Sequence, residues 1–523
     1  MRRYGTYLMV CMAVLCAGGY AVAAAYDEEA DDDNKFSVHG EVRFRGEMWD
    51  NMFDFTDNND AVPGSDDNFD LYPYRYRVLA KGDLGHDIWV GVEFQGTGVA
   101  GGGLFGESTL PFGDGFEIGE SGVSVYQGNI KLVDIGDSVL DITIGRSELV
   151  LDTGLHFSNL PFYNGISHDG AMGQWQWEKF GFTSFLLRNT EGNLDALGIT
   201  CDGAISGVPS GICPDDDHDM WTLGFHGKHF IGGDEHHDIA YYAFIEKQDD
   251  DGLDTEGLAI VADTGEIITL GGRWGKYSPD ESGFHWNIEA ALQTGDYQTA
   301  FTGTILRPNV WGSVTGFGAP SCTPGTLGDA CDAAGIVFEG SAGYTWHGDT
   351  SHTIWGGFTY ASGDDDPNDE DQDAYMPLYT DFHKRLGYAD LWAMSNIQAF
   401  YGGYKVMFGD EKHLLGATVY KFDKAEDEGL SYSPLTGGSG VFVDCPPAGG
   451  VFPDDCDSDL GMELDIFYNY YMTNNLSFDT ALSWVDPGDA VEAHVCGVGG
   501  LECTEGEGSD AAWRLTYQAR ARF

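Results

Sequence analysis

Basic side chains recur at alternate positions near both ends of the 523-residue chain. They are Arg43 and Arg45, then Arg75, Arg77 and Lys81, and near the end Arg514, Arg520 and Arg522. Because side chains an even number of residues apart share one face of a β-strand, each set would form a row of positive charge. A guanidinium presents a fixed planar fork of donors that suits a carboxylate. These rows are therefore candidates to guide carboxylates or small anions.

Glutamates are predicted to lie on the same side of the strands as these arginines, which would be the interior if the strands close into a barrel. The glutamates concerned are Glu41, Glu47, Glu93 and Glu289. Ladders of arginine and glutamate would brace the interior from within and leave little unpaired charge. A guiding wall and an internal brace both fit the sequence.

The segments that carry the basic rows are predicted to be β-strands with one apolar face. Residues 513–523 alternate Trp, Leu, Tyr, Ala, Ala and Phe with Arg, Thr, Gln, Arg and Arg. The same alternation appears at residues 38–48, 74–81, 284–293 and 478–484. The faces of the segments near 181–187, 239–246 and 413–421 are ambiguous. An exported chain built of such strands is expected to form a membrane barrel with lipid outside and water inside.

Short polar turns alternate with long irregular stretches along the chain. The turns lie near residues 82–86, 134–137, 178–180, 231–235, 278–282, 347–350, 409–412 and 473–475. The long stretches lie near 50–72, 96–122, 147–172, 189–219, 248–266, 295–336, 362–396, 422–460 and 486–511. Short turns on one side and long loops on the other are typical of outer-membrane barrels. We therefore predict an all-β, transmembrane antiparallel β-barrel of about eighteen strands, closed by pairing of residues 37–48 with 512–523.

The first 25 residues have the features of a secretory signal peptide. A basic start at Arg2 and Arg3 is followed by an apolar run and by small residues suited to cleavage. An acidic segment, residues 26–36, then precedes the predicted barrel, residues 37–523. We expect export to the bacterial outer membrane, with its lipid as a partner. A soluble barrel or a stack of sandwiches is the alternative, but it would expose aromatic stripes to water.

The charge balance is strongly acidic. The chain has 26 Lys and Arg against 85 Asp and Glu, and loss of Arg2 and Arg3 would take the net charge from −59 to −61. A phosphate backbone would be repelled, so nucleic acid is excluded as a natural partner. The apolar content of 42% argues against a disordered chain.

Eight cysteines outside the leader form four couples close in sequence. The couples are Cys201 and Cys213, Cys322 and Cys331, Cys445 and Cys456, and Cys496 and Cys503. Each couple falls within one predicted outer loop, and in an oxidising compartment such spacings predict disulfides. Each disulfide would close a loop of about 8–13 residues and contribute roughly 2–3 kcal/mol. Metal binding is the alternative, although no couple has the CxxC spacing of a zinc site.

Acidic runs also concentrate in the predicted loops. The densest run offers four candidate calcium ligands, Asp364, Asp366, Asp369 and Asp371. A solvated acidic loop without metal is the alternative, since the spacing of an EF-hand is not met in full. We expect no other cofactor. No Ser/His/Asp grouping or phosphate-binding Gly-rich segment indicates an enzyme.

Three segments carry a family resemblance: residues 42–47 with 74–77, residues 144–146 with 169–170, and residues 375–391, which include His383. Together they resemble outer-membrane porins of the alginate-export type. The resemblance implies an eighteen-stranded barrel whose lumen passes an anionic polysaccharide or a more general solute. It also implies that Arg146 and Asp169 belong to the solute path. A barrel dedicated to polyanions is not expected to have such acidic loops or so few basic residues on its later strands.

Three functions therefore stay open. The first is a porin-like channel that passes small solutes or anionic saccharides through a lumen walled by arginines. The second is a dedicated exporter of an alginate-like polysaccharide, and the third is a surface receptor or adhesin with calcium-binding acidic loops. An acidic outer vestibule ahead of the arginines would give the channel mixed electrostatics. No feature identifies a periplasmic partner.

Overall fold

The computed structural model describes most of the chain after residue 35. The described residues are 36–52, 69–100, 123–136, 138–190, 219–233, 236–249, 254–255, 258–259, 265–277, 282–297, 331–366, 371–427, 457–492 and 510–523. The predicted leader lies outside them, as do the acidic segment except Phe36 and the paired cysteines except Cys331. Within these ranges no helix is long and apolar enough to cross a membrane.

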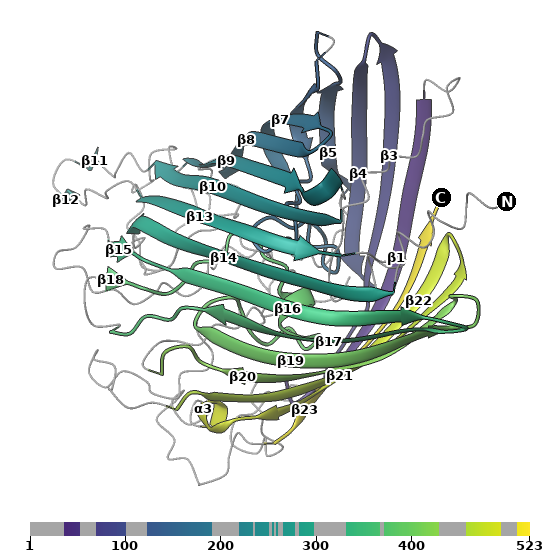
Figure 1. Cartoon of the computed structure of the whole chain (residues 1–523), viewed down its shortest axis with the longest axis vertical. Helices are drawn as coiled ribbons and strands as arrows, with labels where there is room; N and C mark the ends of the chain where they lie inside the picture. The colour runs from purple at the N-terminus through teal and green to yellow at the C-terminus, as the bar shows by residue number, and fades with distance from the viewer. Residues whose placement is uncertain are drawn as a thin grey trace.

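Eighteen strands of the described chain form one closed antiparallel ring (Figure 1). In chain order they are β1 (Phe36–Asp50), β3 (Pro73–Gly85), β4 (Ile88–Val99), β5 (Val123–Leu132), β6 (Leu140–Ser147), β7 (His168–Trp177), β8 (Phe180–Thr190), β9 (Asp219–Phe230), β10 (His237–Asp249), β13 (Gly265–Lys276), β14 (Gly283–Tyr297), β16 (Ile336–His347), β17 (Ser351–Ala361), β19 (Ile397–Phe408), β20 (His413–Asp423), β21 (Asp459–Thr473), β22 (Leu476–Pro487) and β23 (Ala512–Arg522). The ring closes where β1 pairs with β23, from Glu41 opposite Arg522 to Asp50 opposite Trp513. The predicted barrel, its strand count and its closing pair are confirmed.

Shorter elements lie in the long connections. β2 (Phe69–Leu71) extends the pairing of β1, and β15 (Cys331–Ala333) runs parallel to β18 (Asp371–Gln372). β11 (Asp254–Thr255) and β12 (Leu258–Ala259) form a separate pair. The helical turns are η4 (Ile231–Gly233), α2 (Phe382–Arg385) and α3 (Asp489–Glu492). β11, β12, β15 and β18 lie on the left of Figure 1, at the end of the barrel that carries the long connections.

Each of the eight predicted turns falls between two consecutive strands. The first turn is displaced toward the C-terminus. β3 continues to Gly85, and His86 and Asp87 make the turn with φ angles of 60° each. Two successive residues with positive φ form the type I′ turn, whose twist matches that of the paired strands. Residues 82–86 were the expected position because glycine and aspartate also favour turns.

The alternation of side chains sets the two faces of β1 and β14 as predicted. On β1, Phe44 is 61% exposed while Arg43 is 1% exposed. On β14, Phe284 is 71% exposed while Asn287 is fully buried. The outer surface of the barrel is therefore apolar, and the polar side chains of these strands point into the lumen.

Two long connections turn inward and meet inside the barrel. We call residues 148–167 inner loop 1 and residues 371–396 inner loop 2. Phe157 and Tyr379 pair as an isolated parallel bridge between them. The amide of Ser158 donates to the carbonyl of Tyr379 at 3.0 Å, and the amide of Tyr379 donates to the carbonyl of His156 at 2.8 Å. The two loops therefore narrow the lumen as one joined unit.

The hydrophobic core lies inside the barrel, between the inner loops and one part of the wall. Phe157 of inner loop 1 contacts Phe185 of β8 and Phe244 of β10, with ring centroids 5.2 Å and 5.1 Å apart. Trp392 of inner loop 2 packs near Phe422 of β20. This wall is consequently apolar on both faces. The faces of residues 181–187, 239–246 and 413–421 were ambiguous for this reason.

Candidate functional site

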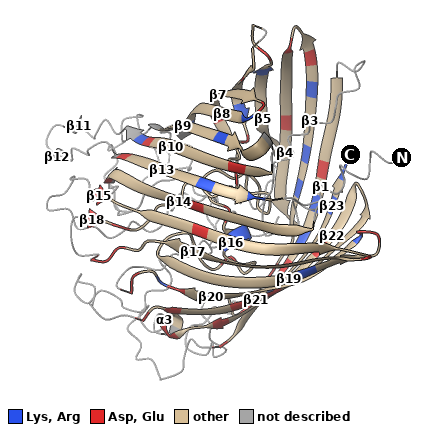
Figure 2. Cartoon of the chain, in the orientation of Figure 1, with Lys and Arg blue, Asp and Glu red and all other residues tan. Residues whose placement is uncertain are grey.

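Three arginines lie in one row across neighbouring strands at the seam of the barrel, where β1 pairs with β23. Arg43 of β1 lies opposite Arg520 of β23 and Arg75 of β3. Two residues along β1, Glu41 lies opposite Arg522 and Arg77. Lys81, Arg45 and Arg514 share the inward parity of these residues. Figure 2 shows that charged residues of both signs gather where β1, β3 and β23 meet.

Buried glutamates pair with several of these arginines. Glu47 forms an ion pair with Arg45 at 2.6 Å and accepts from Arg514 at 2.7 Å, and Glu41 accepts from Arg75 at 2.6 Å. None of these side chains is more than 11% exposed. Charges buried to this extent need partners, because an unpaired ion would carry a large desolvation penalty. The pairing favours the internal brace over the guiding wall at these positions.

The arginine row also holds inner loop 1 against the wall. Arg43 donates to the three carbonyl oxygens of residues 161–163, each at 2.8 Å. Arg75 donates to the carbonyl of Tyr163 at 2.8 Å, and Arg45 donates to the carbonyl of Phe162. Arg77 donates to the carbonyl of residue 164 at 2.8 Å and lies over the ring of Tyr126. Loop carbonyls thus occupy the guanidinium edges that an anion would otherwise contact.

Inner loop 2 is fixed at the same seam by Asp390. Its carboxylate accepts from Arg514 at 2.5 Å and pairs with Nδ1 of His383 at 2.9 Å. Burial raises the pKa of Asp390, but His383 and Arg514 outweigh burial and hold this pKa below its ordinary value. The carboxylate therefore stays ionised and keeps inner loop 2 attached to β23.

Two carboxylates of β21 bind backbone amides of inner loop 2. Glu463 accepts from the amide of Ala389 at 2.9 Å, and Asp465 accepts from the amide of Tyr388 at 3.1 Å. Gly387 precedes these amides with a φ of +91°, and a Cβ there would lie 2.3 Å from Oε1 of Glu463. Only glycine fits this close approach without strain. Sequence reasoning did not single out these carboxylates, although both have inward parity on β21.

A second cluster of charges anchors inner loop 1 to the opposite part of the wall. Asp152 forms an ion pair with Lys228 at 2.6 Å and pairs with His226 at 2.6 Å, both on β9. Arg273 of β13 lies 3.9 Å from Asp152 and 2.5 Å from Asp238. Burial raises the pKa of Asp152, yet Lys228 and His226 outweigh it and keep the pKa well below its usual range. Inner loop 1 is therefore tied to both sides of the lumen.

His156 lies between the two inner loops and the wall as a neutral side chain. Nε2 lies 2.8 Å from the hydroxyl of Tyr242, and Nδ1 lies 3.0 Å from the hydroxyl of Tyr375. Burial and then the charge of Arg385 lower the pKa of His156 to about 3. The imidazole consequently remains uncharged at neutral pH and joins both loops to β10.

A column of stacked rings lies inside the barrel near the β1–β23 seam. The guanidinium of Arg45 lies 4.0 Å from the ring centre of Phe162, and Phe162 stacks on His383 at 3.5 Å. His383 stacks in turn on Tyr388 at 4.7 Å, and Tyr388 meets Phe467 of β21 edge-on at 5.9 Å. The column therefore connects β1 to β21 through both inner loops.

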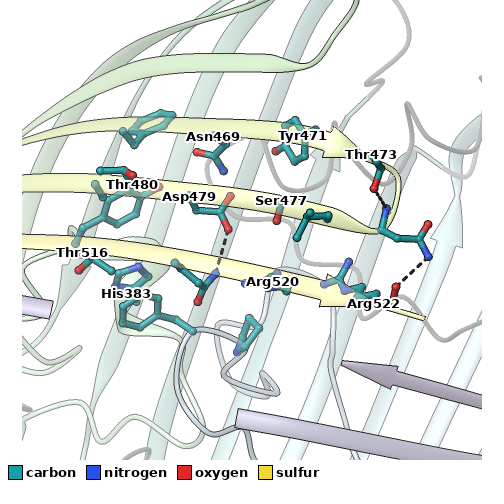
Figure 3. A pocket seen from close by; sticks show the side chains of 18 of the residues that line it. His383, Asn469, Tyr471, Thr473, Ser477, Asp479, Thr480, Thr516, Arg520 and Arg522 are labelled. Carbon is teal, nitrogen blue, oxygen red and sulfur yellow. Dashed lines mark hydrogen bonds between the residues drawn. The ribbon is translucent and has the colours of Figure 1, made fainter. Parts of the chain in front are cut away.

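A cavity of about 270 Å³ lies under this column, at the short-turn end of the barrel. Its walls come from β21, β22, β23 and the turn between β21 and β22 (Figure 3). The polar residues of these strands and this turn that line it are Asn469, Tyr471, Thr473, Asn474, Asn475, Ser477, Asp479, Thr480, Thr516, Gln518, Arg520 and Arg522. Phe162, His383 and Tyr388 line its other side. The arrangement offers hydrogen-bond donors and acceptors beside ring edges.

Arg520 and Arg522 differ from the other arginines of the seam. Their side chains are 16% and 44% exposed, and their Nε atoms lie 4.0 Å and 3.5 Å from Oε2 of Glu41. Neither guanidinium is seen to donate to an inner loop, whereas Arg43 and Arg75 both do. A solute inside the cavity could reach these two cations.

Two residues of the predicted solute path lie outside the lumen. Arg146 pairs with Asp169 across β6 and β7, with Nε to Oδ1 at 2.9 Å, and the two side chains are 44% and 51% exposed. Arg146 has the parity of Ile144, which is 51% exposed on the outer surface. The expectation that Arg146 and Asp169 line the pore was therefore wrong. The family resemblance implied that these two residues line the pore, whereas the alternation of side chains along β6 places Arg146 on the outer surface.

The predicted loop sites are described only in part. Asp364 is buried and accepts from Gln372 at 2.9 Å, whereas Asp366 and Asp371 are exposed and Asp369 lies outside the described residues. Within the described part of the chain, no group of three or more His, Cys, Asp or Glu could hold a metal ion. Seven of the eight cysteines in the predicted couples lie outside that part, so the disulfides stay a prediction.

Comparisons with known proteins give one family and a set of similar barrels. The family model described as alginate export matches residues 215–498, which is more than half of the chain. No curated protein matches the sequence.

Among solved structures, the chain is similar to OccK8 (OprE) from Pseudomonas aeruginosa, with 12% identity, a TM-score of 0.48, and coverage of 93% of this chain and 98% of that chain. It is also similar to the outer membrane protein OprD from Pseudomonas aeruginosa, with 10% identity, a TM-score of 0.48, and coverage of 94% of each chain. Pseudomonas putida OprB matches with 10% identity and a TM-score of 0.41, over 94% of each chain. These identities are too low to imply a shared solute.

Proposed function

Because the chain belongs to the alginate export family, we propose that it is an outer-membrane channel that passes small solutes and saccharides through its barrel. The observation that carries the proposal is a closed ring of strands with a polar cavity inside one end. The apolar outer surface suits a bilayer, so membrane lipid is the partner of that surface. The short-turn end would then face the periplasm, and the long connections would face outward.

The two inner loops would set the width of the path. They are held by ion pairs and hydrogen bonds from β1, β3, β9, β21 and β23. A lumen narrowed by bound loops admits small solutes and extended chains but excludes folded proteins. Arg520 and Arg522 are the cations that a solute would contact, and the other seam arginines serve the loops.

A dedicated exporter of an acidic polysaccharide is the second candidate. The family match favours it, since the model is described as alginate export. The engagement of Arg43, Arg45 and Arg75 by loop carbonyls weighs against it, because a dense polyanion would need these guanidinium groups.

Solute flux into liposomes tests the channel. The purified chain would be reconstituted into liposomes, and swelling would be followed after addition of neutral sugars of increasing size. We expect swelling that slows as the sugar grows. Swelling no faster than in protein-free liposomes would contradict the proposal.

Two variants locate the path. Phe162→Ala removes a ring that borders the cavity, so larger sugars should enter faster. Phe400→Leu changes a side chain that is 52% exposed on the outer surface, so its swelling rates should equal those of the wild type. Equal rates for Phe162→Ala and the wild type would mean that solutes do not pass the cavity.

A further inference from the structure

Two arginines face outward from the barrel at the end that carries the long connections. Arg146 of β6 lies opposite Asp169 of β7, and Asp169 lies opposite Arg188 of β8. All three side chains are exposed, and they share the outward parity of Ile144 and Leu186. Among the described residues, every other arginine lies at an inward position of a strand or in inner loop 2. We call Arg146, Asp169 and Arg188 the outer row.

The outer row lies near the edge of the apolar band and not in its middle. On β7, Asp169 precedes Trp177 by eight positions, and Trp177 is 44% exposed at the short-turn end. Eight positions span about 27 Å of strand, or about 20 Å along the membrane normal for a strand tilted by about 40°. The apolar band of an outer-membrane barrel is about 25 Å tall. The outer row therefore lies close to the level of the lipid head groups.

The outer row has an excess of positive charge. It contains two guanidinium groups and one carboxylate, and its neighbours across the sheet are uncharged, Gly128 of β5 and Trp221 of β9. The next acidic residues in this register, Glu266 and Asp296, lie three and four strands away from Arg188. Three strands correspond to about 14 Å, which exceeds the screening length of about 8 Å at physiological salt. The outer row therefore attracts an anion, although the chain has a net charge of −59.

Asp169 does not use all the hydrogen-bond donors of Arg146. Nε of Arg146 donates to Oδ1 of Asp169 at 2.9 Å, and Nη2 donates to Oδ2. Nη1 donates to the carbonyl of Val125 at 3.4 Å. A guanidinium carries five N–H groups, so Arg146 keeps two for another acceptor. Phosphate oxygens suit such donors because arginine and phosphate pair through parallel N–H···O bonds.

An apolar surface begins directly below the outer row. Two positions nearer the short turns, Ile144 of β6, Ala171 of β7 and Leu186 of β8 lie side by side. Ile144 and Leu186 are 51% and 52% exposed. A ligand with a phosphate at one end and acyl chains at the other would contact both surfaces. A dissolved anion would gain nothing from the apolar surface, so the geometry favours a lipid.

We propose that the outer row binds the phosphate of a phosphorylated lipid in the outer leaflet, while the acyl chains of that lipid cover Ile144 and Leu186. The inference rests on the proposed placement of the barrel in the outer membrane and specifies a lipid group that its surface recognises. Arg146 and Arg188 would bind the phosphate, and the charge of Asp169 would limit the affinity.

Native mass spectrometry of the purified full-length chain in detergent micelles tests this lipid site. The probes are diphosphoryl lipid A and the same lipid with both phosphates removed. We expect the phosphorylated lipid to bind more tightly. One cation at an anionic lipid surface changes the affinity about fivefold, so Arg146→Ser with Arg188→Ser should weaken binding of the phosphorylated lipid roughly thirtyfold.

Matched variants separate recognition from folding. Asp169→Asn removes the carboxylate of the outer row, so it should tighten binding of the phosphorylated lipid about fivefold, and a misfolded barrel would not gain affinity. Lys421→Ser is the control for loss of an outward positive charge on a distant strand, β20. Lys421 is 34% exposed and pairs with both Asp423 and Asp459, so its loss should change neither affinity.

Two results would overturn the lipid site. They are equal affinity of the wild type for the two lipids, or equal affinity of the double variant and the wild type for the phosphorylated lipid. Light scattering measures the oligomeric state in the same micelles. An oligomer of the wild type that the double variant dissociates, without a change in lipid affinity, would assign the outer row to contact between copies of the chain.

Liposome swelling distinguishes failure of the lipid site from failure of the channel. A chain that swells liposomes but binds both lipids equally is a channel without this lipid site. A chain that prefers the phosphorylated lipid but causes no swelling has the lipid site and is not a channel.

Discussion

Arg514 of the last strand donates to Glu47 of the first strand at 2.7 Å, across the seam that closes the barrel. The same guanidinium donates to Asp390 of inner loop 2 at 2.5 Å. The three side chains are at most 3% exposed. One arginine therefore connects barrel closure to the loop that narrows the lumen.

Replacement of Arg514 by methionine should destabilise the barrel strongly. Glu47 would keep Arg45 and Asp390 would keep His383, but both carboxylates would lose their bond to Arg514. Breaking a buried ion pair by removing one partner typically lowers the free energy of unfolding by about 3–5 kcal/mol. The measurement is the midpoint concentration of guanidinium chloride that unfolds the chain in micelles, monitored by tryptophan fluorescence.

Arg522→Met is the matched control for this substitution. Its side chain is 44% exposed and lies 3.5 Å from Glu41, so its loss should change stability by less than about 1 kcal/mol. Equal midpoints for Arg514→Met and Arg522→Met would show that Arg514 does not hold the seam and the loop together.

Gly387→Ala should release inner loop 2 from β21. The alanine Cβ would lie 2.3 Å from Oε1 of Glu463, and the backbone φ of +91° is strained for any residue except glycine. We expect a loss of roughly 1–3 kcal/mol in local stability. Hydrogen exchange of the amides of Tyr388 and Ala389 measures it, and their protection should fall.

Gly283→Ala provides the comparison for the glycine substitution. A Cβ at Gly283 meets nothing within 4 Å, and its φ lies outside the left-handed region. Amide protection in inner loop 2 should be the same as in the wild type. Unchanged protection in Gly387→Ala as well would argue against the carboxylate clamp of Glu463 and Asp465.

Packing of the inner loops should weaken in mild acid because of His156. Its pKa is about 3 in the folded chain against an ordinary 6.5. Packing is therefore at full strength above pH 6.5 and weakens as the pH falls toward 3, because a released loop takes up the proton first. The contribution of His156 to this loss is about 3 kcal/mol at pH 4.5. Single-channel recordings between pH 7.5 and 4.5 should show larger or noisier currents at the acidic end.

His156→Gln should remove the part of this pH dependence that His156 supplies. Glutamine can still donate and accept a hydrogen bond but does not titrate. Asp152 and Asp390 have pKa values below the ordinary 3.8, so their stabilising charge is lost only below that pH. A pH response in His156→Gln equal to that of the wild type would assign the effect to another group.

The strands and their number could be predicted because alternation is a local property. Each strand of a barrel touches the outer surface on one side, so residues such as Phe44 and Phe284 mark their own face. Arg146 could have been placed correctly by the same rule, since it shares the parity of Ile144. The family resemblance placed Arg146 in the lumen, whereas the local alternation of side chains places it on the outer surface, where the structure has it.

The inward path of the two loops could not be predicted from local sequence. Residues 148–167 have no strand or helix period, and their partners lie far away in the chain. Arg43 binds carbonyls about 120 residues ahead, and Arg514 binds Asp390 124 residues before it. Basic residues at even spacing indicate a charged row, but they do not reveal whether a solute or the chain itself occupies that row.

The central claim is that the seam arginines have two different tasks. Arg43 and Arg75 hold inner loop 1, whereas Arg520 and Arg522 face the path of the solute. The sequence predicts instead that Arg43, Arg75 and Arg520 all belong to rows that guide anions. The division of tasks can be measured as the reversal potential and conductance of single channels in planar bilayers under a salt gradient.

Two double variants make this measurement decisive. Arg520→Ser with Arg522→Ser should shift the reversal potential toward cation preference and leave the loop in place, because fixed charge in a confined lumen is poorly screened. Arg43→Ser with Arg75→Ser should raise the conductance because it frees inner loop 1. Its reversal potential should change less than that of the Arg520 and Arg522 double variant. Two results together would contradict this division of tasks. The variant with Arg43→Ser and Arg75→Ser would shift the reversal potential as much as the variant with Arg520→Ser and Arg522→Ser, and its conductance would not rise.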